Sequence, residues 1–550
     1  MMFRPTVIGL ITAVLLAYGC SMSPADSTGG YSGVVEGVVK DSSGQPLSGA
    51  FVKLKNAERR LTFMVISQDR GRYTAKKLPA GAYILQGVGN GFQSEWSDPV
   101  EVTERGTGQL DLSLTDPQAL MLPAAWPRRL PAEQATVEFL PEGAGKEIIS
   151  THCGSCHASS MVVLRSRYDR DAWQTTIDQM REYMRGGGLR ELSNEEAGVL
   201  MDYVATHFTS LPTPDPNSRL PRTLMQGEAT NYRVVQYELE NTTANTHDVA
   251  VDPYGIGWAN QLVGGKVSRF DPETLEYSEI SPPLTTAERA RPGNLQISDE
   301  GVIWLPDSNE TRWLSYDIKA AEWTSWDFPS TIRGSANGNS MALHPDGTIW
   351  LTGPGAVRRL NPVTKEWSAW DTPTWTRPQE NPGGYGITVA GDGRVWFALQ
   401  NVDRMARVDP KTDAVDEFEI PVEGISYPRR MDTDPEGDVW VALWAAGKLM
   451  KIDQQTADMT LFDPPTPYNG AYSVSIDQAN DLIWVTLHRV DKIARFNPKT
   501  NQWVEFPLPQ AETDVRRIEV DQNNPNRVWW SSTAHFGGVA RIGFIELLDN

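Results

Sequence analysis

The sequence predicts a mostly β protein built from several domains, and two observations carry that prediction. The chain has 550 residues, more than one ordinary domain holds. It combines 19 tryptophans with 46 glycines and 38 prolines, a composition typical of short strands joined by tight turns. We expect a β-sandwich, a small all-α unit and a seven-bladed β-propeller, in that order along the chain.

The acidic balance of the chain argues against one class of partner. The formal net charge is −20, whereas binding to nucleic-acid phosphates needs basic surface. The charge is compatible with a soluble, monomeric body and with a cationic partner. We therefore expect no nucleic-acid partner.

The N-terminus predicts export. Arg4 precedes an apolar run over residues 7–16, and small residues follow it. These are features of a secretory signal, and the run is shorter than the ~20 apolar residues that a membrane span needs.

The end of this signal, Ala17-Tyr18-Gly19-Cys20, resembles a bacterial lipoprotein box, with Ala17 where Leu is usual. The resemblance implies that Cys20 is lipidated and anchors the protein to a membrane. Ser21 follows Cys20, where inner-membrane retention uses Asp, so the resemblance favours the outer membrane, facing the periplasm. We expect a lipoprotein signal over 1–20 and a flexible tether over 21–30.

Residues 31–115 alternate apolar and polar side chains between turn signals, which predicts a small antiparallel β-sandwich. This segment resembles the carboxypeptidase regulatory-like domain family, whose members usually serve as spacers or binding modules. The resemblance is carried by Gly37-Val38-Val39-Lys40-Asp41, Gly44-Gln45-Pro46-Leu47-Ser48-Gly49-Ala50, Gly71-Arg72-Tyr73, Leu78-Pro79-Ala80-Gly81-Ala82-Tyr83 and Gly91-Phe92. We see no catalytic residues in it.

A proline-rich linker over 116–141 leads to a helical unit over 142–209. Helical patterns run from Gly143 to Ser150 and from Asp169 to Met184. A third helix begins after Ser193, whose spacing from Glu196 is that of a capping box. A second linker follows over 210–231.

The helical unit contains Cys153-Gly154-Ser155-Cys156-His157, the pattern of a c-type haem attachment site. Cys153 and Cys156 would bond the haem covalently and His157 would be the axial iron ligand. A zinc site is the rival, but it needs a second ligand pair, and the only other cysteine is Cys20. A redox-active dithiol without haem also stays open, although it does not require His157. Short helices around this motif resemble the class I cytochrome c fold.

Methionine is the usual sixth ligand of such an iron in electron-transfer proteins. Met161 is too close to His157 to reach the other haem face, and Met201 belongs to a packing pattern. Met180 and Met184 lie one helical turn apart beside Trp173. Similar domains place Met as Met180 stands, so we favour Met180, then Met184, then an open or His-ligated site. Core packing is the alternative for each methionine.

The remaining residues, 232–550, form a repeat marked by tryptophan at positions 258, 304, 350, 396, 440, 484 and 529. A period of about 45 residues with about four short strands is typical of propeller blades, whereas solenoid repeats are usually shorter. The seventh repeat lacks its last strand, and residues 233–239 supply a matching one ahead of the first. Pairing of the two ends would close the ring and remove an open sheet edge.

The blades resemble the streptogramin (virginiamycin B) lyase-like propeller family over most of 233–545. The matching stretches are His247-Asp248-Val249-Ala250-Val251-Asp252, Val395-Trp396-Phe397-Ala398 and Met405-Ala406-Arg407-Val408-Asp409-Pro410-Lys411-Thr412. The resemblance implies a lyase that uses histidines and a glutamate around a magnesium ion at one mouth of the channel. Of the histidines, only His247 falls in the ring described next; His344, His488 and His535 do not match it. Lyase activity is therefore doubtful.

Equivalent positions at the start of the inner strands predict a ring of residues at that mouth. Its members are His247, Gly293, Asn339, Tyr385, Arg429, Tyr472 and Arg516. Two arginines and two tyrosines indicate an anionic or sugar-like ligand. The alternative is that these residues bind water and neighbouring loops.

Together these patterns predict an exported monohaem c-type cytochrome lipoprotein that transfers single electrons. Its propeller would bind a small-molecule substrate or a redox partner protein. One alternative is a periplasmic oxidoreductase with the propeller as catalytic domain. Another is a non-redox binding protein of the cell envelope.

Overall fold

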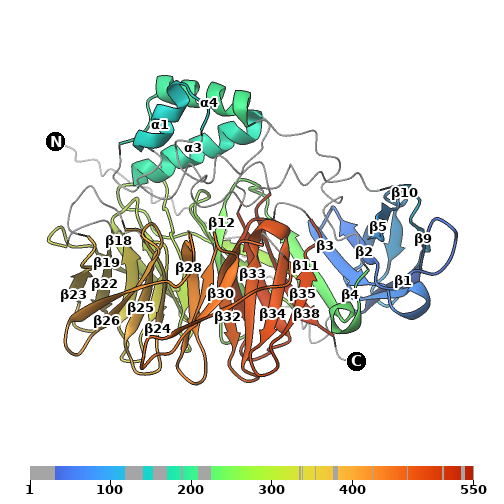
Figure 1. Ribbon diagram of the computed structural model, residues 1–550. Helices are drawn as coiled ribbons and strands as arrows, with labels where there is room; N and C mark the ends of the chain where they lie inside the picture. Colours follow the sequence, from blue (N-terminus) through green and yellow to red (C-terminus); the bar gives the residue numbers. More distant parts are fainter. Residues whose placement is uncertain are drawn as a thin grey trace, which may run out of the picture.

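The computed structural model describes residues 31–117, 140–152, 170–186, 190–208, 224–332, 336, 338–353, 355–375, 382–424, 426–466, 469–510, 513–533 and 539–548. The residues predicted to carry lipid and haem, Cys20 and Cys153 to His157, lie outside this part of the chain, as do Met161 and His535. The described residues form a mostly β protein in which a sandwich, a propeller and a helical unit are in contact (Figure 1).

The N-terminal unit is a sandwich-like pair of sheets, as predicted, but it is not wholly antiparallel, because β1 pairs parallel with β8 and β9. One sheet has the order β4-β1-β8 with β9 beside β1, and the other begins β10-β6-β5-β2-β3 with β7 beside β5. Alternate side chains such as Val35, Leu54 and Leu85 are fully buried between them. The strands are β1 (Gly33–Lys40), β2 (Phe51–Asn56), β3 (Leu61–Ile66), β4 (Arg72–Leu78), β5 (Gly81–Gly89), β6 (Phe92–Gln93), β7 (Val100–Val102), β8 (Thr107–Gln109), β9 (Leu112–Ser113) and β10 (Asp116–Pro117).

The propeller repeats a unit of four antiparallel strands. The inner strands are β12 (Thr246–Val251), β16 (Gln296–Ile297), β20 (Met341–Leu343), β24 (Gly384–Val389), β28 (Pro428–Thr433), β32 (Ala471–Asp477) and β36 (Val515–Val520). The second strands are β13 (Gly257–Gln261), β17 (Val302–Asp307), β21 (Ile349–Gly353), β25 (Val395–Leu399), β29 (Val439–Leu443), β33 (Leu482–Leu487) and β37 (Arg527–Ser532).

The outer half of each unit completes the sheet. The third strands are β14 (Val267–Phe270), β18 (Arg312–Asp317), β22 (Ala356–Asn361), β26 (Arg404–Asp409), β30 (Lys448–Ile452), β34 (Lys492–Asn497) and β38 (Arg541–Leu547). The outermost are β15 (Tyr277–Ile280), β19 (Glu322–Asp327), β23 (Glu366–Asp371), β27 (Ala414–Glu419), β31 (Met459–Phe462), β35 (Gln502–Pro507) and β11 (Tyr232–Glu238).

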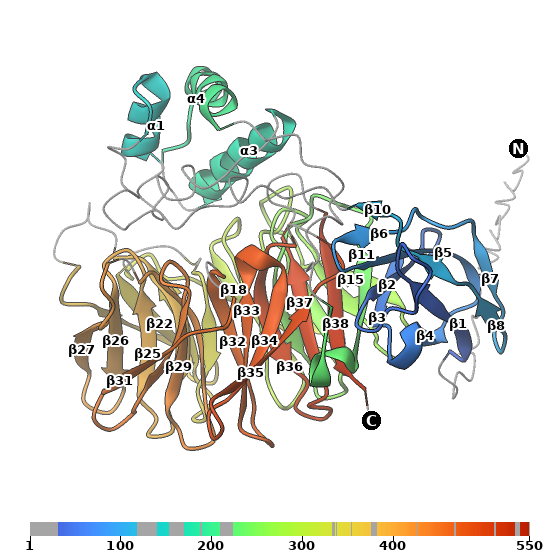
Figure 2. The same cartoon turned by 45° about the vertical axis from the view of Figure 1, so that its right-hand side comes forward.

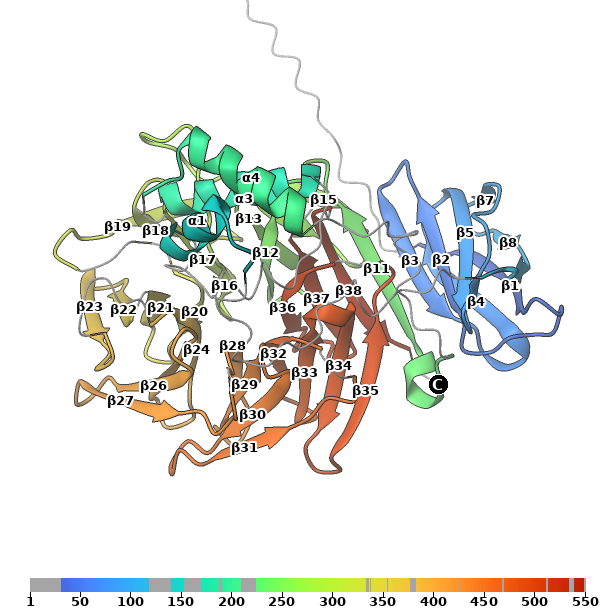
Figure 3. The same cartoon turned by 45° about the horizontal axis from the view of Figure 1, so that its top comes forward.

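The repeating tryptophans all lie on second strands and are buried, so the repeat marks one strand of each blade. The inner strands contact one another in a closed cycle, from β12 through β16, β20, β24, β28 and β32 to β36 and back to β12. The ring arrangement is visible from above (Figure 3).

The ring closes as the sequence predicts for residues 233–239. β11 pairs antiparallel with β38, from Tyr232 opposite Leu547 to Glu238 opposite Arg541. The first described strand of this part of the chain thus completes the last blade.

The free edge of β11 is covered by the N-terminal sandwich, which the sequence does not predict. β3 pairs antiparallel with β11, with Val234 opposite Met64 and Tyr237 opposite Leu61. One sheet therefore runs from the sandwich into the seventh blade, in the order β10-β6-β5-β2-β3-β11-β38-β37-β36 (Figure 2). This pairing fixes the sandwich against the propeller.

The helical unit contains α1 (Ala144–His152), α3 (Arg170–Gly186) and α4 (Asn194–His207) in its described part. The predicted capping box is confirmed: the Ser193 hydroxyl accepts from the Glu196 N–H, and the Glu196 carboxylate accepts from the Ser193 N–H. None of the described helices is long and apolar enough to cross a membrane.

The helical unit rests on the propeller face where the inner strands begin (Figures 1 and 2). The Glu182 carboxylate on α3 accepts from Arg289, and its backbone carbonyl accepts from Arg291. Both arginines lie in the segment between β15 and β16, which enters the second inner strand from that face. The helices thus sit over the mouth at which the ring of residues was predicted.

Candidate functional site

Five of the seven inner strands have a break in their pairing with the second strand at the mouth of the channel. The register with the second strand shifts between Thr246 and Val249, between Pro428 and Met431, and at the equivalent points of β24, β32 and β36. A β-bulge changes the direction of the side chains that it contains. Consecutive residues, such as His247 and Asp248, therefore both take part in contacts at the mouth.

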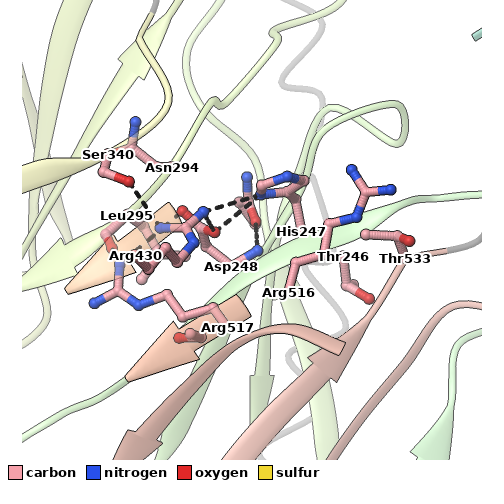
Figure 4. Close-up of polar contacts among 12 residues, drawn as sticks. Thr246, His247, Asp248, Asn294, Leu295, Ser340, Arg430, Arg516, Arg517 and Thr533 are labelled. Atoms are coloured by element: carbon pink, nitrogen blue, oxygen red, sulfur yellow. Dashed lines mark hydrogen bonds and ion pairs between the residues drawn. The ribbon is translucent and has the colours of Figure 1, made fainter. Parts of the chain in front are cut away.

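Asp248 is the centre of a buried ion network that crosses the channel (Figure 4). Its Oδ1 accepts from Arg430 of the fifth blade and lies 2.9 Å from Nδ1 of His247. Its Oδ2 lies 4.0 Å from Nη1 of Arg517 in the seventh blade. Burial works to raise the pKa of Asp248, but Arg430, His247 and Arg517 together hold it below its ordinary value. Asp248 is therefore ionised at neutral pH.

The two arginines extend this network around the ring. Arg430 donates from Nη1 to the Ser340 hydroxyl at 3.0 Å. Arg517 donates from Nη1 to the Leu295 carbonyl at 3.0 Å and from Nη2 to Glu519 at 2.8 Å. Burial lowers the pKa of His247 against the opposing effect of Asp248, so its imidazole is neutral near pH 7.

Two carboxyl groups lie one step further along the inner strands. Asp432 accepts from the N–H groups of Thr433 at 2.8 Å and Ile476 at 2.9 Å. Burial raises the pKa of Asp432 to about 7, with Glu519 adding to the rise and Arg517 opposing it. Burial also raises the pKa of Glu519, against Arg517. This layer of the channel can hold and release protons near neutral pH.

Aromatic side chains surround Arg429 at the mouth. Its guanidinium carbon lies 4.3 Å from the ring centre of Tyr385, 4.5 Å from Tyr427 and 4.8 Å from Tyr472. The hydroxyl of Tyr385, in the fourth blade, hydrogen-bonds to the hydroxyl of Tyr472, in the sixth blade. Arg429 also donates from Nη1 to Gln400 Oε1 at 2.8 Å.

Asp514 joins the sixth and seventh blades beside this aromatic group. It accepts from Arg516 through both carboxylate oxygens, each at 3.1 Å, and it contacts Nε2 of His488. The His488 ring in turn stacks on Tyr472 with centres 5.0 Å apart. His488 thus lies next to the ring although it is not one of the seven equivalent positions.

The structure brings four of the predicted ring residues into one group: Tyr385, Arg429, Tyr472 and Arg516. The other predicted positions serve other contacts. His247 turns to Asp248, Asn339 donates to the Gly384 carbonyl at 2.7 Å, and the Gly293 N–H donates to the Pro306 carbonyl at 2.9 Å. Whether the group binds a ligand stays a prediction.

Sequence reasoning missed the layer that links the blades, formed by Asp248, Arg430 and Arg517. The signal was present in the doublets Arg429-Arg430 and Arg516-Arg517, which occupy equivalent places in two blades. Strict alternation along a strand sends neighbours to opposite faces, so only one member of each doublet was assigned to the ring. The bulges remove that alternation.

Among the described methionines of the helical unit, Met180 lies outside the packed core. Met184 is 6% exposed and belongs to a buried cluster with Trp173, Ile177 and Met201, whereas Met180 is half-buried. This arrangement fits the predicted haem ligand, because Met180 is not needed for packing. Neither methionine is thereby shown to bind iron.

In the described ranges, no group of three or more His, Cys, Asp or Glu residues is placed to hold a metal ion. The buried acids are instead matched to arginines and backbone N–H groups. The chemistry that these side chains can perform is ion binding, hydrogen bonding and proton exchange.

Comparisons with known proteins support both β-rich parts. The sequence profile of the virginiamycin B lyase family matches residues 285–547. The C-terminal part is a virginiamycin B lyase-like β-propeller. The carboxypeptidase regulatory-like domain profile matches residues 34–115, so the predicted resemblance of the N-terminal part is also supported.

A solved structure supports the propeller fold, and a second one is similar to a lesser degree. A streptogramin B lyase structure matches with a TM-score of 0.50 at 19% identity, covering 58% of this chain and 100% of that one. A catalytically inactive virginiamycin B lyase from Staphylococcus aureus with quinupristin gives a TM-score of 0.49 at 19% identity, with coverages of 58% and 100%. At this identity the likeness concerns the fold alone. No curated protein matches the chain.

Proposed function

We propose that the protein is an exported c-type cytochrome, lipid-anchored through Cys20, whose propeller mouth binds a substrate or redox partner. The observation that carries the proposal is a juxtaposition. The helical unit that contains the Cys153–His157 motif is held over the mouth by Glu182, Arg289 and Arg291. A ligand in the mouth would lie beneath the redox unit.

A bound haem would supply one-electron transfer; Cys153 and Cys156 would hold it covalently, and His157 would bind its iron. Met180 is the side chain that we propose would bind the iron as well. The chain's own residues would position the ligand: Arg429 and the paired tyrosines at the mouth, with Asp432 and Glu519 as proton acceptors below it. Such an arrangement suits a reaction in which electrons and protons leave the same ligand.

The test is a pyridine haemochrome spectrum and an optical redox titration of protein purified from a host with cytochrome-maturation machinery. We expect one haem c per chain. Cys156→Ala should leave the haem loosely held, so that it is lost on a denaturing gel. A colourless protein from that host would refute the proposal.

The second candidate is a non-redox binding protein of the cell envelope. The comparisons favour it in one respect, since they support the sandwich and the propeller, the two parts without the haem motif. A third role is that of an oxidoreductase, and steady-state reduction of the haem distinguishes it from an electron carrier. In an oxidoreductase, a substrate would reduce the haem without an added partner protein.

A further inference from the structure

Arg429 is a buried cation without a matching anion. It is 8% exposed and is the second residue of β28, the inner strand of the fifth blade. Eight other arginines are buried to a similar degree, and six of them have a carboxylate within 4.0 Å: Arg233, Arg312, Arg430, Arg517, Arg527 and Arg541. Of the other two, Arg291 donates to the Glu182 carbonyl, and Arg358 feels the charge of Asp371. Among the described residues Arg429 has no such carboxylate.

The surroundings of Arg429 do not replace that anion. Its one side-chain hydrogen bond in the described structure goes to the neutral amide of Gln400, and its buried Nε has no hydrogen-bond partner there. The rings of Tyr385, Tyr427 and Tyr472 stabilise a cation through their faces, but they carry no net charge. A buried charge that lacks a partner is costly, so this position favours a bound anion.

The paired tyrosines point to the same kind of ligand. Two hydroxyls carry two protons, and the single hydrogen bond between Tyr385 and Tyr472 uses one of them. One O–H group is therefore left to donate to an acceptor. Burial raises the pKa of Tyr385, which keeps its phenol protonated at neutral pH. A guanidinium and a free O–H donor thus lie together within aromatic walls.

We propose that Arg429 and the Tyr385–Tyr472 pair bind the carboxylate of an organic acid with an apolar body. The inference rests on the proposed function in that it identifies the ligand of the same mouth. One uncompensated cation matches the single charge of a carboxylate better than the charge of a phosphate. The neighbouring Arg516 does not add a second uncompensated cation, because its Nε and Nη2 both donate to the Asp514 carboxylate.

The test is isothermal titration of the full chain at low salt with benzoate and with its neutral analogue benzamide. We expect benzoate to bind and benzamide to bind at least about tenfold more weakly, since charge-assisted hydrogen bonds are lost. Galacturonate and inorganic phosphate distinguish the other sources of an anion. Binding of galacturonate that requires Arg429 supports the carboxylate but assigns a sugar body, whereas binding of phosphate alone overturns the proposal.

Two variants test the residues. Arg429→Gln should lower the affinity for benzoate by about tenfold or more. Arg359→Gln is the matched control, because Arg359 also lies on two rings, at 5.6 Å from Trp350 and 5.0 Å from Trp370, but is half-exposed and lies on a third strand. It should bind as the unaltered protein does. Equal affinities of Arg429→Gln and Arg359→Gln would refute the assignment.

A second variant keeps the proposal testable if Arg429→Gln does not fold. Tyr385→Phe/Tyr472→Phe retains both rings and removes both hydroxyls, and it should lower the affinity for benzoate several-fold. Benzoate should also raise the melting temperature of the unaltered protein but not of this variant at the same concentration. Haem absorbance recorded on the same samples separates the two hypotheses. If benzoate binds to a protein that contains no haem, only the electron-transfer proposal is refuted. If the protein contains haem but binds none of the acids, only the carboxylate site is refuted.

Discussion

At the scale of single residues, the mouth of the propeller combines side chains that the sequence indicates with others that it hides. Tyr385, Arg429, Tyr472 and Arg516 could be predicted, because equivalent blade positions can be counted from the tryptophan repeat. Asp248 and Arg430 could not, since their contact joins blades one and five across the ring and depends on a three-dimensional approach. The doublet Arg429-Arg430 signals a second arginine at this place, but a single sequence does not indicate that its partner is Asp248.

The two methionines of α3 should respond differently to truncation. Met180→Ala should remove the weak near-infrared band that a thioether–iron bond gives, with little loss of stability. Met184→Ala should keep the band and lower the free energy of unfolding by about 2–5 kcal/mol, because it leaves a cavity in the buried cluster. Absorbance of the oxidised protein and denaturant melts provide both readings. If only Met184→Ala lost the band, Met184 rather than Met180 would be the iron ligand.

Asp432 should make the protein less stable as the pH rises. A carboxyl whose pKa is raised to about 7 binds more protons in the folded than in the unfolded chain, where its pKa is near its ordinary 3.8. Its contribution to stability is therefore complete below about pH 4 and is lost as the pH rises through about 7. Asp432→Asn should reduce the dependence of the free energy of unfolding on pH without abolishing it, because burial also raises the pKa of the neighbouring Glu519.

Denaturant melts between pH 4 and pH 8 measure this effect. The amide retains one acceptor oxygen for the two N–H groups that Asp432 serves, so an offset of about 1–2 kcal/mol at all pH values is expected. Asp458→Asn is a suitable control on the surface of the fifth blade. An unchanged slope in Asp432→Asn would show that other groups cause the pH dependence.

At the scale of elements, the tryptophan repeat and the turn residues between strands predict most of the helices and strands of the structure. The second strands, the capping box of α4 and the strand that closes the ring follow from tryptophan spacing, S-x-x-E spacing and alternation. The bulges of the inner strands do not, because a bulge changes hydrogen bonding without a distinctive residue. The contact between α3 and the segment before β16 also has no sequence signal.

That contact should hold the helical unit in place. Arg289→Ala/Arg291→Ala removes both donors to Glu182, and we expect the unit to separate from the propeller while its helices stay folded. Small-angle scattering should show a larger radius of gyration, with unchanged circular dichroism. Arg170→Ala is the control, since its partner Asp202 lies within the helical unit at 2.7 Å. Equal radii for the two variants would argue for additional contacts.

At the scale of the whole molecule, the sandwich and the propeller share one sheet and part of one core. Val35 and Leu54 of the sandwich belong to the same buried cluster as Val249 and Trp529 of the propeller. Phe51 and Met64 likewise pack in a cluster with Trp484. The linker composition alone left the arrangement of the domains open, and the pairing of β3 with β11 determines it.

We expect these two parts to unfold together. Scanning calorimetry should show one transition for sandwich and propeller, and Met64→Ala should lower its midpoint as a whole, at a cost of about 2–5 kcal/mol. Val363→Ala, at a turn position that is 87% exposed, should leave it unchanged. A split into two transitions in Met64→Ala would indicate independent domains.

The position of β11 between β3 and β38 has a consequence for biogenesis. The sandwich precedes the propeller in the chain, so it is also the first of the two to leave an export channel. N-terminal units generally fold first, so β3 is available as a template when β11 emerges. β38 is the last of the described strands, so its docking edge on β11 is already ordered when β38 emerges. The blades would thus form one after another, starting from a β11 that is already paired with β3, and β38 would then pair with the other edge of β11. In the meantime β3 covers one edge of β11 and keeps it from pairing with other molecules.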